Sequence, residues 1–219
     1  MEPIKTIQQK LDEGRQYRNF DVSGFERRSA DDGEKVVEGY ATVFNQPYEL
    51  YRFSGEGYIY IVREQIDANA FDEADMADVI MQYDHEGRVF ARMSNNTLTV
   101  TPDEKGLLIE ADLGGTELGR QLFEEIRGGY TNKMSFGFTV EEERRDERTD
   151  EGNRIHILRT ITRIRKLYDV SAVSLPANDA TEISARSLGE GAIARIKEER
   201  LAEQERQRKI QVIKTLLEV

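Results

Sequence analysis

The chain has 219 residues, of which 42 are acidic and 31 basic, so its formal net charge at pH 7 is -11. This balance argues against nucleic acid as the main partner, because phosphate backbones bind basic surfaces. The absence of cysteine excludes disulfides, thiol nucleophiles and cysteine-based zinc sites. No apolar run approaches the roughly 18 residues of a membrane helix, and no signal peptide precedes the polar start of the chain. We therefore expect an intracellular or particle-enclosed protein with no membrane partner.

Residues 1–34 are predicted to form an N-terminal arm outside the main domain. Apolar residues recur at helical spacing near the start of the chain, which predicts a helix within residues 1–20. The Asp-Asp-Gly sequence at 31–33 favours a turn. The folded domain is therefore expected to begin at residue 35.

The next part of the chain is rich in β-branched and aromatic residues, which favour strands. Strands are predicted over 36–44, 58–64 and 79–83, and a hairpin is predicted to join 98–101 to 106–112. Residues 51–57 hold two glycines and are expected to form a loop. Asp67 is predicted to cap a short helix that runs to residue 74.

One helix is predicted inside the domain, over residues 116–127, because its apolar residues fall at helical spacing and Gly128-Gly129 follows. A strand at 134–138 comes next. Residues 141–151 are densely charged and are expected to form a solvated loop or an exposed hairpin. Residues 155–173 contain two further strand-like stretches. Residues 188–219 are predicted to form a polar helix with a weak apolar stripe. Strands outnumber helices, which argues against a parallel sheet of the dinucleotide-binding kind.

The chain has only two histidines, and one of them, His85, follows a predicted buried strand at the start of a loop. Histidine is the usual general base for a serine nucleophile. The leading serine is Ser135, next to Gly137, whose missing side chain leaves room for a substrate backbone. The residue pattern alone favours a structural role for each, as an ordinary strand serine and a loop histidine. His156 is the rival base, although its place in a predicted strand favours a sheet residue.

A third group is needed to hold the imidazole, and Asp169 is the candidate because a carboxylate within an apolar strand is costly to bury unless it is paired. A strand-edge acid facing water is the alternative interpretation. The sequence has no phosphate-binding loop and no dinucleotide fingerprint. Its histidines and acids form no recognisable metal motif. We therefore expect neither a cofactor nor a metal.

Several short motifs, in this order along the chain, resemble the tailed-phage prohead (capsid-maturation) serine proteases of the herpesvirus-assemblin-like superfamily. The most specific are Tyr-Asp-His at 83–85 and Met-Ser-Phe-Gly-Phe at 134–138. The others lie at 39–45, 70–72, 97–98, 103–107 and 169–177. The chain has Asn-Ala-Phe at 69–71 where the family has Gly-Ala-Phe. The resemblance covers roughly residues 35–187, which it marks as a protease domain.

The resemblance implies an α+β, mostly β fold: a closed antiparallel β-barrel-like core with surrounding helices, to which the predicted helical terminal arms are added. It implies a serine endopeptidase in which Ser135 is the nucleophile and His85 the base. Asp169 falls where the family usually has a glutamate. Because the herpesvirus relatives use a second histidine as the third member, His156 stays open as an alternative to Asp169.

The resemblance also implies a setting: the assembling procapsid inside the host cytoplasm. The expected substrates are the scaffold protein or the scaffolding segment of the major capsid protein, and the protease itself. The oligomeric state is left open, a homodimer included. Two other functions remain: a catalytically inert scaffolding protein with a protease-like domain, and an unrelated β-rich binding module.

Overall fold

The computed structural model describes residues 9–10, 13–20, 26–28, 35–55, 57–173 and 206. All of these except Arg206 belong to one of the chain's two compact units, Met1–Ala177, and Arg206 belongs to the other, Asn178–Val219. The first elements in chain order are β1 (Gln16–Phe20), β2 (Glu26–Arg28), β3 (Val36–Val43), β4 (Tyr48–Gly55), β5 (Tyr58–Ile66), β6 (Ile80–Tyr83) and β7 (Glu86–Arg92). They are followed by η1 (Met93–Asn95), β8 (Leu98–Pro102), β9 (Gly106–Asp112), α2 (Glu117–Gly128), β10 (Lys133–Thr149) and β11 (Arg154–Val173).

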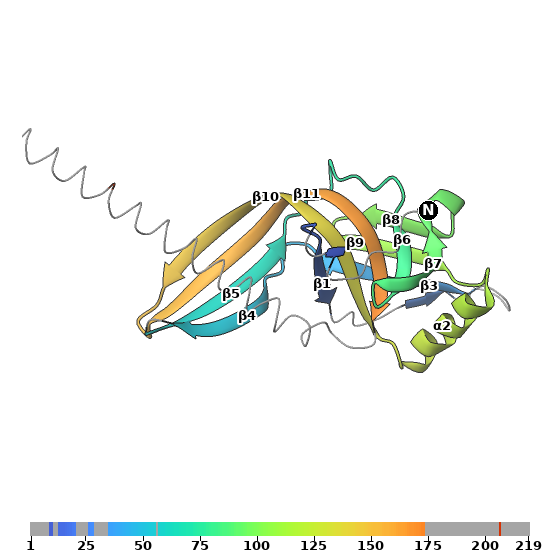
Figure 1. Ribbon diagram of the computed structural model, residues 1–219, viewed down its shortest axis with the longest axis horizontal. Helices are drawn as coiled ribbons and strands as arrows, with labels where there is room; N and C mark the ends of the chain where they lie inside the picture. The colour runs from blue at the N-terminus through green and yellow to red at the C-terminus, as the bar shows by residue number, and fades with distance from the viewer. Residues whose placement is uncertain are drawn as a thin grey trace, which may run out of the picture. The chain divides into compact units, whose positions relative to one another are not determined.

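A seven-stranded sheet is built on the long hairpin of β10 and β11 (Figure 1). Its main order is β1-β10-β11-β5-β4, and β6 and β7 extend it beside the end of β11. Strand β11 pairs in parallel with β5 over its first half and in parallel with β6 over Asp169–Ala172. One edge of β11 therefore serves two strands that are far apart in sequence.

The β10–β11 hairpin changes character along its length. Four shifts of register between Gly137 and Glu143 interrupt the ladder, and such bulges bend a strand and increase its twist. Before the shifts β10 is buried on both faces, and after them its residues are largely exposed. The charged segment 141–151 thus forms an exposed hairpin, one of the two structures expected for it.

A second, antiparallel sheet has the order β2-β3-β9-β8. It contains the predicted hairpin, and the β8–β9 turn is closed by Asp103, whose Oδ1 accepts the amide hydrogens of Lys105 and Gly106 at 2.7 and 2.8 Å. A side chain at Gly106 would place its Cβ 2.0 Å from the carbonyl oxygen of Thr42. Glycine is therefore required where β9 passes the bulge in β3.

Helix α2 confirms the prediction for 116–127 almost to the residue. The side chain of Thr116 accepts the amide hydrogen of Gly119 at 2.9 Å, as expected of an N-cap. Gly129 ends the helix in the left-handed conformation, with φ of 75°. The helix packs its apolar face into a cluster that also takes side chains from both sheets. The buried residues of that face are Leu122, Phe123 and Ile126.

The expected closed, helix-surrounded antiparallel barrel is wrong. In the described part of the chain both sheets are open, and β11 pairs in parallel with two strands. Among the described residues, α2 is the α-helix whose start and end are both defined. The helical arm expected over 1–20 is wrong at its end, where Gln16–Phe20 forms β1. The predicted C-terminal helix at 188–219 lies outside the described residues apart from Arg206. Strand pairing depends on contacts between distant segments, which local patterns do not specify.

Two local predictions are also wrong. Residues 51–57 were expected to form a loop, but Tyr48–Gly55 pairs with β5 as β4, where Phe53 and Tyr60 stack with ring centroids 4.7 Å apart. The helix expected after Asp67 is a series of turns, in which Ala70 donates to the carbonyl of Asp67 at 3.1 Å. In both segments tertiary contacts override the local signal.

None of the helices among the described residues has the length and apolar character to span a membrane.

Candidate active site

The register between β10 and β11 gathers polar side chains of the site on one face of the large sheet. Ser135 on β10 lies opposite Ser171 on β11, and Gly137 lies opposite Asp169. Directly paired residues share a face of the sheet, and alternate residues do so along a strand. The other face of β10 carries Met134, Phe136 and Phe138, which are fully buried in the core. Because successive side chains of a strand point to opposite faces, the polar site and the apolar core lie on opposite faces of β10.

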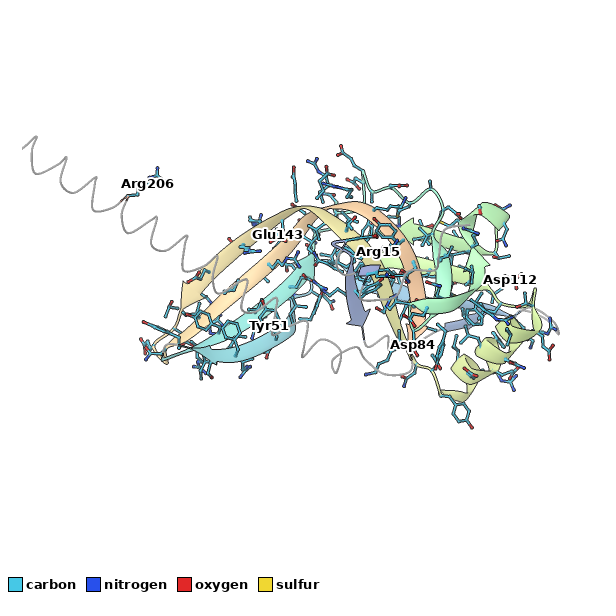
Figure 2. All side chains as sticks on the ribbon, in the orientation of Figure 1. Arg15, Tyr51, Asp84, Asp112, Glu143 and Arg206 are labelled. Atoms are coloured by element: carbon cyan, nitrogen blue, oxygen red, sulfur yellow. The ribbon has the colours of Figure 1, made fainter. Side chains whose placement is uncertain are left out.

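His85 is positioned by the two-residue turn between β6 and β7. Tyr83 pairs with Glu86, and the two residues between them, Asp84 and His85, both have positive φ, 48° and 59°. Two consecutive left-handed residues are the mark of a type I′ hairpin turn, which glycine and asparagine usually occupy. The amide of Asp84 donates to the carbonyl of Ala172 at 3.0 Å, so the turn is fastened to the end of β11. Figure 2 labels Asp84 at this turn.

The turn brings the imidazole between the other two candidate residues. Nε2 of His85 lies 2.6 Å from Oγ of Ser135, and Nδ1 is hydrogen-bonded to Oδ1 of Asp169. The hydroxyl of Ser171 donates to the same carboxylate oxygen at 3.1 Å. All four side chains are buried, and Ser135 is 0% exposed. The three residues proposed from the sequence therefore form one continuous hydrogen-bonded chain.

The carboxylate of Asp169 determines which atoms donate and which accept in these hydrogen bonds. An ionised carboxylate only accepts hydrogen bonds, so Nδ1 of His85 carries the hydrogen and donates it to Asp169. Nε2 is then free to accept the hydroxyl hydrogen of Ser135. Aspartate, although shorter than glutamate, reaches the imidazole because β6 pairs with β11 from Asp169 onward. The arrangement can deprotonate a serine hydroxyl as it attacks an electrophile.

Tyr17 on β1 adds an aromatic wall to the site. Its ring centroid lies 4.2 Å from that of His85, at a tilt of 54°. Burial, followed by the negative charge of Asp169, raises the pKa of Tyr17 to about 12. The phenol therefore stays neutral near pH 7 and places no second anion beside the carboxylate.

Gly137 makes room inside the site itself. A Cβ at this position would lie 2.5 Å from Oδ2 of Asp169 and 2.7 Å from Cε1 of Tyr17. The space that the sequence suggested for a substrate backbone is thus taken up by two side chains of the same protein. Oδ2 of Asp169 is buried and has no hydrogen-bond partner among the described residues.

His156, the alternative third member, lies apart from this cluster. It pairs with Arg148 near the β10–β11 turn, and its Nε2 is 3.1 Å from Oδ2 of Asp150. Asp169 lies about 40 Å further along β11, at roughly 3.3 Å per residue. His156 therefore has no contact with Ser135 or His85.

Three further residues of the site were not identified from the sequence. Ser171 could have been found, because it lies two residues after Asp169 and so on the same strand face. Tyr17 and Lys10 had no such signal, since both fall in the predicted arm. Lys10 is buried and its Nζ donates to the carbonyl oxygen of His85 at 2.7 Å. Within the described ranges, no group of three or more histidine, aspartate or glutamate side chains could hold a metal ion.

Comparison with known proteins places these residues in a family context. A family model described as Caudovirus prohead serine protease matches residues 23–193. The matched range spans well over half of the chain, contains Ser135, His85 and Asp169, and begins after β1. No curated protein and no solved structure matches the chain.

Proposed function

The chain belongs to the caudovirus prohead serine protease family, and on that premise we propose that it is an endopeptidase with a Ser-His-Asp triad. Family membership makes the protein a serine peptidase of capsid maturation. In the proposal Ser135 is the nucleophile, His85 the general base and acid, and Asp169 the residue that holds the imidazole. No step requires a cofactor.

The proposed reaction passes through an acyl-enzyme. Oγ of Ser135 attacks the carbonyl carbon of the scissile peptide bond while Nε2 of His85 takes the hydroxyl proton. The imidazolium donates that proton to the departing amine, and the C–N bond breaks. Water, deprotonated by His85, then cleaves the ester and restores Ser135. Asp169 stabilises the imidazolium in both steps by accepting the hydrogen on Nδ1.

One observation carries this proposal: the imidazole of His85 bridges Ser135 and Asp169, with 2.6 Å between Nε2 and Oγ. A serine hydroxyl is a weak nucleophile until a base within hydrogen-bond reach takes its proton. The alternatives of an ordinary strand serine and a loop histidine do not require this alignment. All three residues come from separate strands or turns, so neighbourhood in sequence does not explain it.

The proposed substrates are the scaffold protein or the scaffolding segment of the major capsid protein, and then the protease itself. The family description, a protease of the prohead, supports this setting inside the procapsid. Residues 188–219 are proposed to be the second arm, outside the protease domain at 35–187, whereas within the first expected arm, residues 1–34, β1 and β2 pair with strands of the domain. The polar helix predicted for the second arm could dock on helical scaffold segments.

Co-expression with the cognate major capsid protein tests the proposal. Intact-mass spectrometry should show the capsid protein and the protease shortened at defined positions with the parent chain. The Ser135→Ala variant should leave both at full length. Ser54→Ala, which removes an exposed serine of β4, is the matched control and should process like the parent.

The outcomes separate the competing functions. If Ser135→Ala particles mature with uncut capsid protein, the protein is an inert assembly factor. If the capsid protein is cut equally with Ser135→Ala and the parent, Ser135 is not the nucleophile. In the latter case, co-expression without this protein is the control. A contaminating protease would give the same fragment ends there.

A further inference from the structure

The proposed nucleophile is closed off in this conformation. Ser135 is 0% exposed, Asp169 1% and His85 5%. Peptide hydrolysis requires the scissile carbonyl to come within about 3 Å of the attacking oxygen in a defined orientation. A segment of the protein must therefore move before a polypeptide substrate can reach Ser135.

Strand β1 is the segment that lies along the nucleophile. It pairs antiparallel with β10, so that Asn19 lies opposite Ser135 and Tyr17 opposite Gly137. The other edge of β10 is paired with β11 at the same positions. Among the described residues, β1 thus takes the one edge at which a further extended chain could pair beside Ser135. Extended peptides commonly bind by adding a strand to such an edge.

We infer that this edge of β10 is the substrate-binding edge and that β1 is an intramolecular occupant, which an extended segment of the substrate must displace. The inference rests on the proposed function of Ser135. It gives the substrate a chemical form: an unfolded or extended polypeptide segment, recognised through its backbone. A scaffolding segment that is not folded into a domain fits this description, whereas a folded capsid domain does not.

The side-chain contacts of β1 are mostly polar, with the ring of Tyr17 against His85 as an exception. Arg18 donates to Glu64 from Nη2 at 2.9 Å, and Arg159 donates to the side chain of Gln16 at 2.9 Å. Just before the strand, the guanidinium of Arg15 stacks 3.7 Å above the ring of Tyr168. The described side chains of β1 are half-buried, and none belongs to the apolar core. Releasing β1 would leave the core intact.

Two further observations support the same conclusion. The ring of Tyr17 contacts His85 and passes over Gly137, so it fills space beside the imidazole that a bound substrate would need. In addition, the family match begins at residue 23, after β1. The strand that covers the site therefore lies outside the part of the chain that matches the family.

The test measures how fast Ser135 reacts in the full-length protein when β1 is loosened. The probe is a fluorophosphonate, which attaches covalently to an activated serine hydroxyl with loss of fluoride. Arg18→Ala removes the ion pair that fastens β1, while Arg159 still balances the charge of Glu64. Lys10→Met removes the hydrogen bond that fastens the segment just before β1 to the carbonyl of His85. Arg52→Ala, which removes an exposed ion pair with Glu49, is the matched control.

Loosening β1 should raise the rate of labelling at least tenfold in Arg18→Ala and about threefold in Lys10→Met, and leave it unchanged in Arg52→Ala. A synthetic peptide with the sequence of residues 13–22 should slow the labelling of Arg18→Ala towards the parent rate. Should Arg18→Ala fail to fold, as judged by circular dichroism, Lys10→Met with the same peptide decides the question.

Equal labelling rates in the folded variants and the parent, with no effect of the peptide, would overturn the inference. The proposed function would survive that result as long as Ser135→Ala abolishes labelling. Labelling that persists in the Arg18→Ala/Ser135→Ala double variant would instead overturn the proposed function, and the inference with it. The two failures are therefore distinguishable in one series of experiments.

Discussion

At the scale of single residues, Asp169 makes two contacts that depend on its charge. Its Oδ1 accepts from Nδ1 of His85 and from the hydroxyl of Ser171. These bonds favour one tautomer of the imidazole, the one whose Nε2 can receive a proton from Ser135. The acid therefore acts by its position and charge.

Replacing Asp169 with asparagine should lower kcat on a peptide substrate by about 10³–10⁴-fold, because an amide can donate a hydrogen to Nδ1 and so favour the wrong tautomer. Ser171→Ala, the milder control, removes one hydrogen bond to the same oxygen. It should lower kcat by about tenfold or less, as expected for about 1 kcal/mol. Steady-state kinetics on folded variants would check this. A kcat for Asp169→Asn close to the parent value would mean that Asp169 is not the third member.

Gly137→Ala should reduce activity without unfolding the protein. The added methyl group would lie 2.5 Å from Oδ2 of Asp169 and 2.7 Å from Tyr17, so at least one of these side chains must move. Gly115→Ala is the matched control, because a Cβ there meets nothing within 4 Å. We expect kcat to fall by at least tenfold in Gly137→Ala and to be unchanged in Gly115→Ala, with thermal unfolding measured on both. Full activity of Gly137→Ala would show that the site tolerates the shift.

At the scale of elements, the β6–β7 hairpin determines where the base lies. Asp84 and His85 both adopt the left-handed conformation, and the amide of Asp84 is bonded to the end of β11. Such strain in non-glycine residues often occurs at functional sites, where surrounding structure holds it in place. The position of the imidazole is thus a property of the turn.

Asp84→Pro should abolish activity and lower stability by about 2 kcal/mol or more, since proline cannot adopt a φ of 48° and has no amide hydrogen for Ala172. Asp84→Asn should retain both properties, because asparagine tolerates the left-handed region. Urea unfolding and a peptide-cleavage assay would test the pair. If Asp84→Pro were as active as Asp84→Asn, the turn would not be what positions His85.

At the scale of the whole molecule, Glu64 joins strands from different parts of the large sheet. It is fully buried on β5 and contacts Arg18 of β1, Tyr48 of β4 and Arg159 of β11. Burial alone would raise the pKa of Glu64, but the charge and hydrogen bond of Arg18, the charge of Arg159 and the hydrogen bond of Tyr48 outweigh it and hold the pKa below its usual value. This cluster ties β1 to the rest of the sheet.

Glu64→Gln should destabilise the protein by about 3–5 kcal/mol at pH 7, because two partly buried guanidinium groups lose the counter-charge of a fully buried carboxylate. The pKa of Glu64 is lower in the folded than in the unfolded state. Its stabilising contribution is therefore complete above the unfolded value of about 4.3 and is lost as the pH falls through the folded value. The stability difference between parent and variant should be constant from pH 7 to about 5 and should shrink below about 4.

Urea unfolding at a series of pH values would measure this difference. Glu49→Gln, at the exposed pair with Arg52, is the matched control and should change stability little at any of these pH values. A difference between the parent and Glu64→Gln that stays constant down to pH 3 would contradict the assigned pKa shift.

Elements whose signals are contained in a few consecutive residues could be predicted from the sequence. Helix α2 has its own N-cap at Thr116 and its own glycine stop, and the β8–β9 hairpin has its own turn at Asp103. Short motifs likewise identified Ser135 and His85 as candidates. These features depend on contacts within a few residues, which is the range over which a sequence pattern carries information.

The sequence by itself determined the strand-rich character of the chain, its one internal helix and a short set of candidate residues. Only the tertiary structure decided that β11 pairs in parallel with β5 and β6, that the sheets stay open, and that β1 lies beside Ser135. It also decided that Asp169 rather than His156 meets the imidazole. The physical reason is that strand partners and register are set by packing between segments distant in sequence, and each strand alone is compatible with several partners.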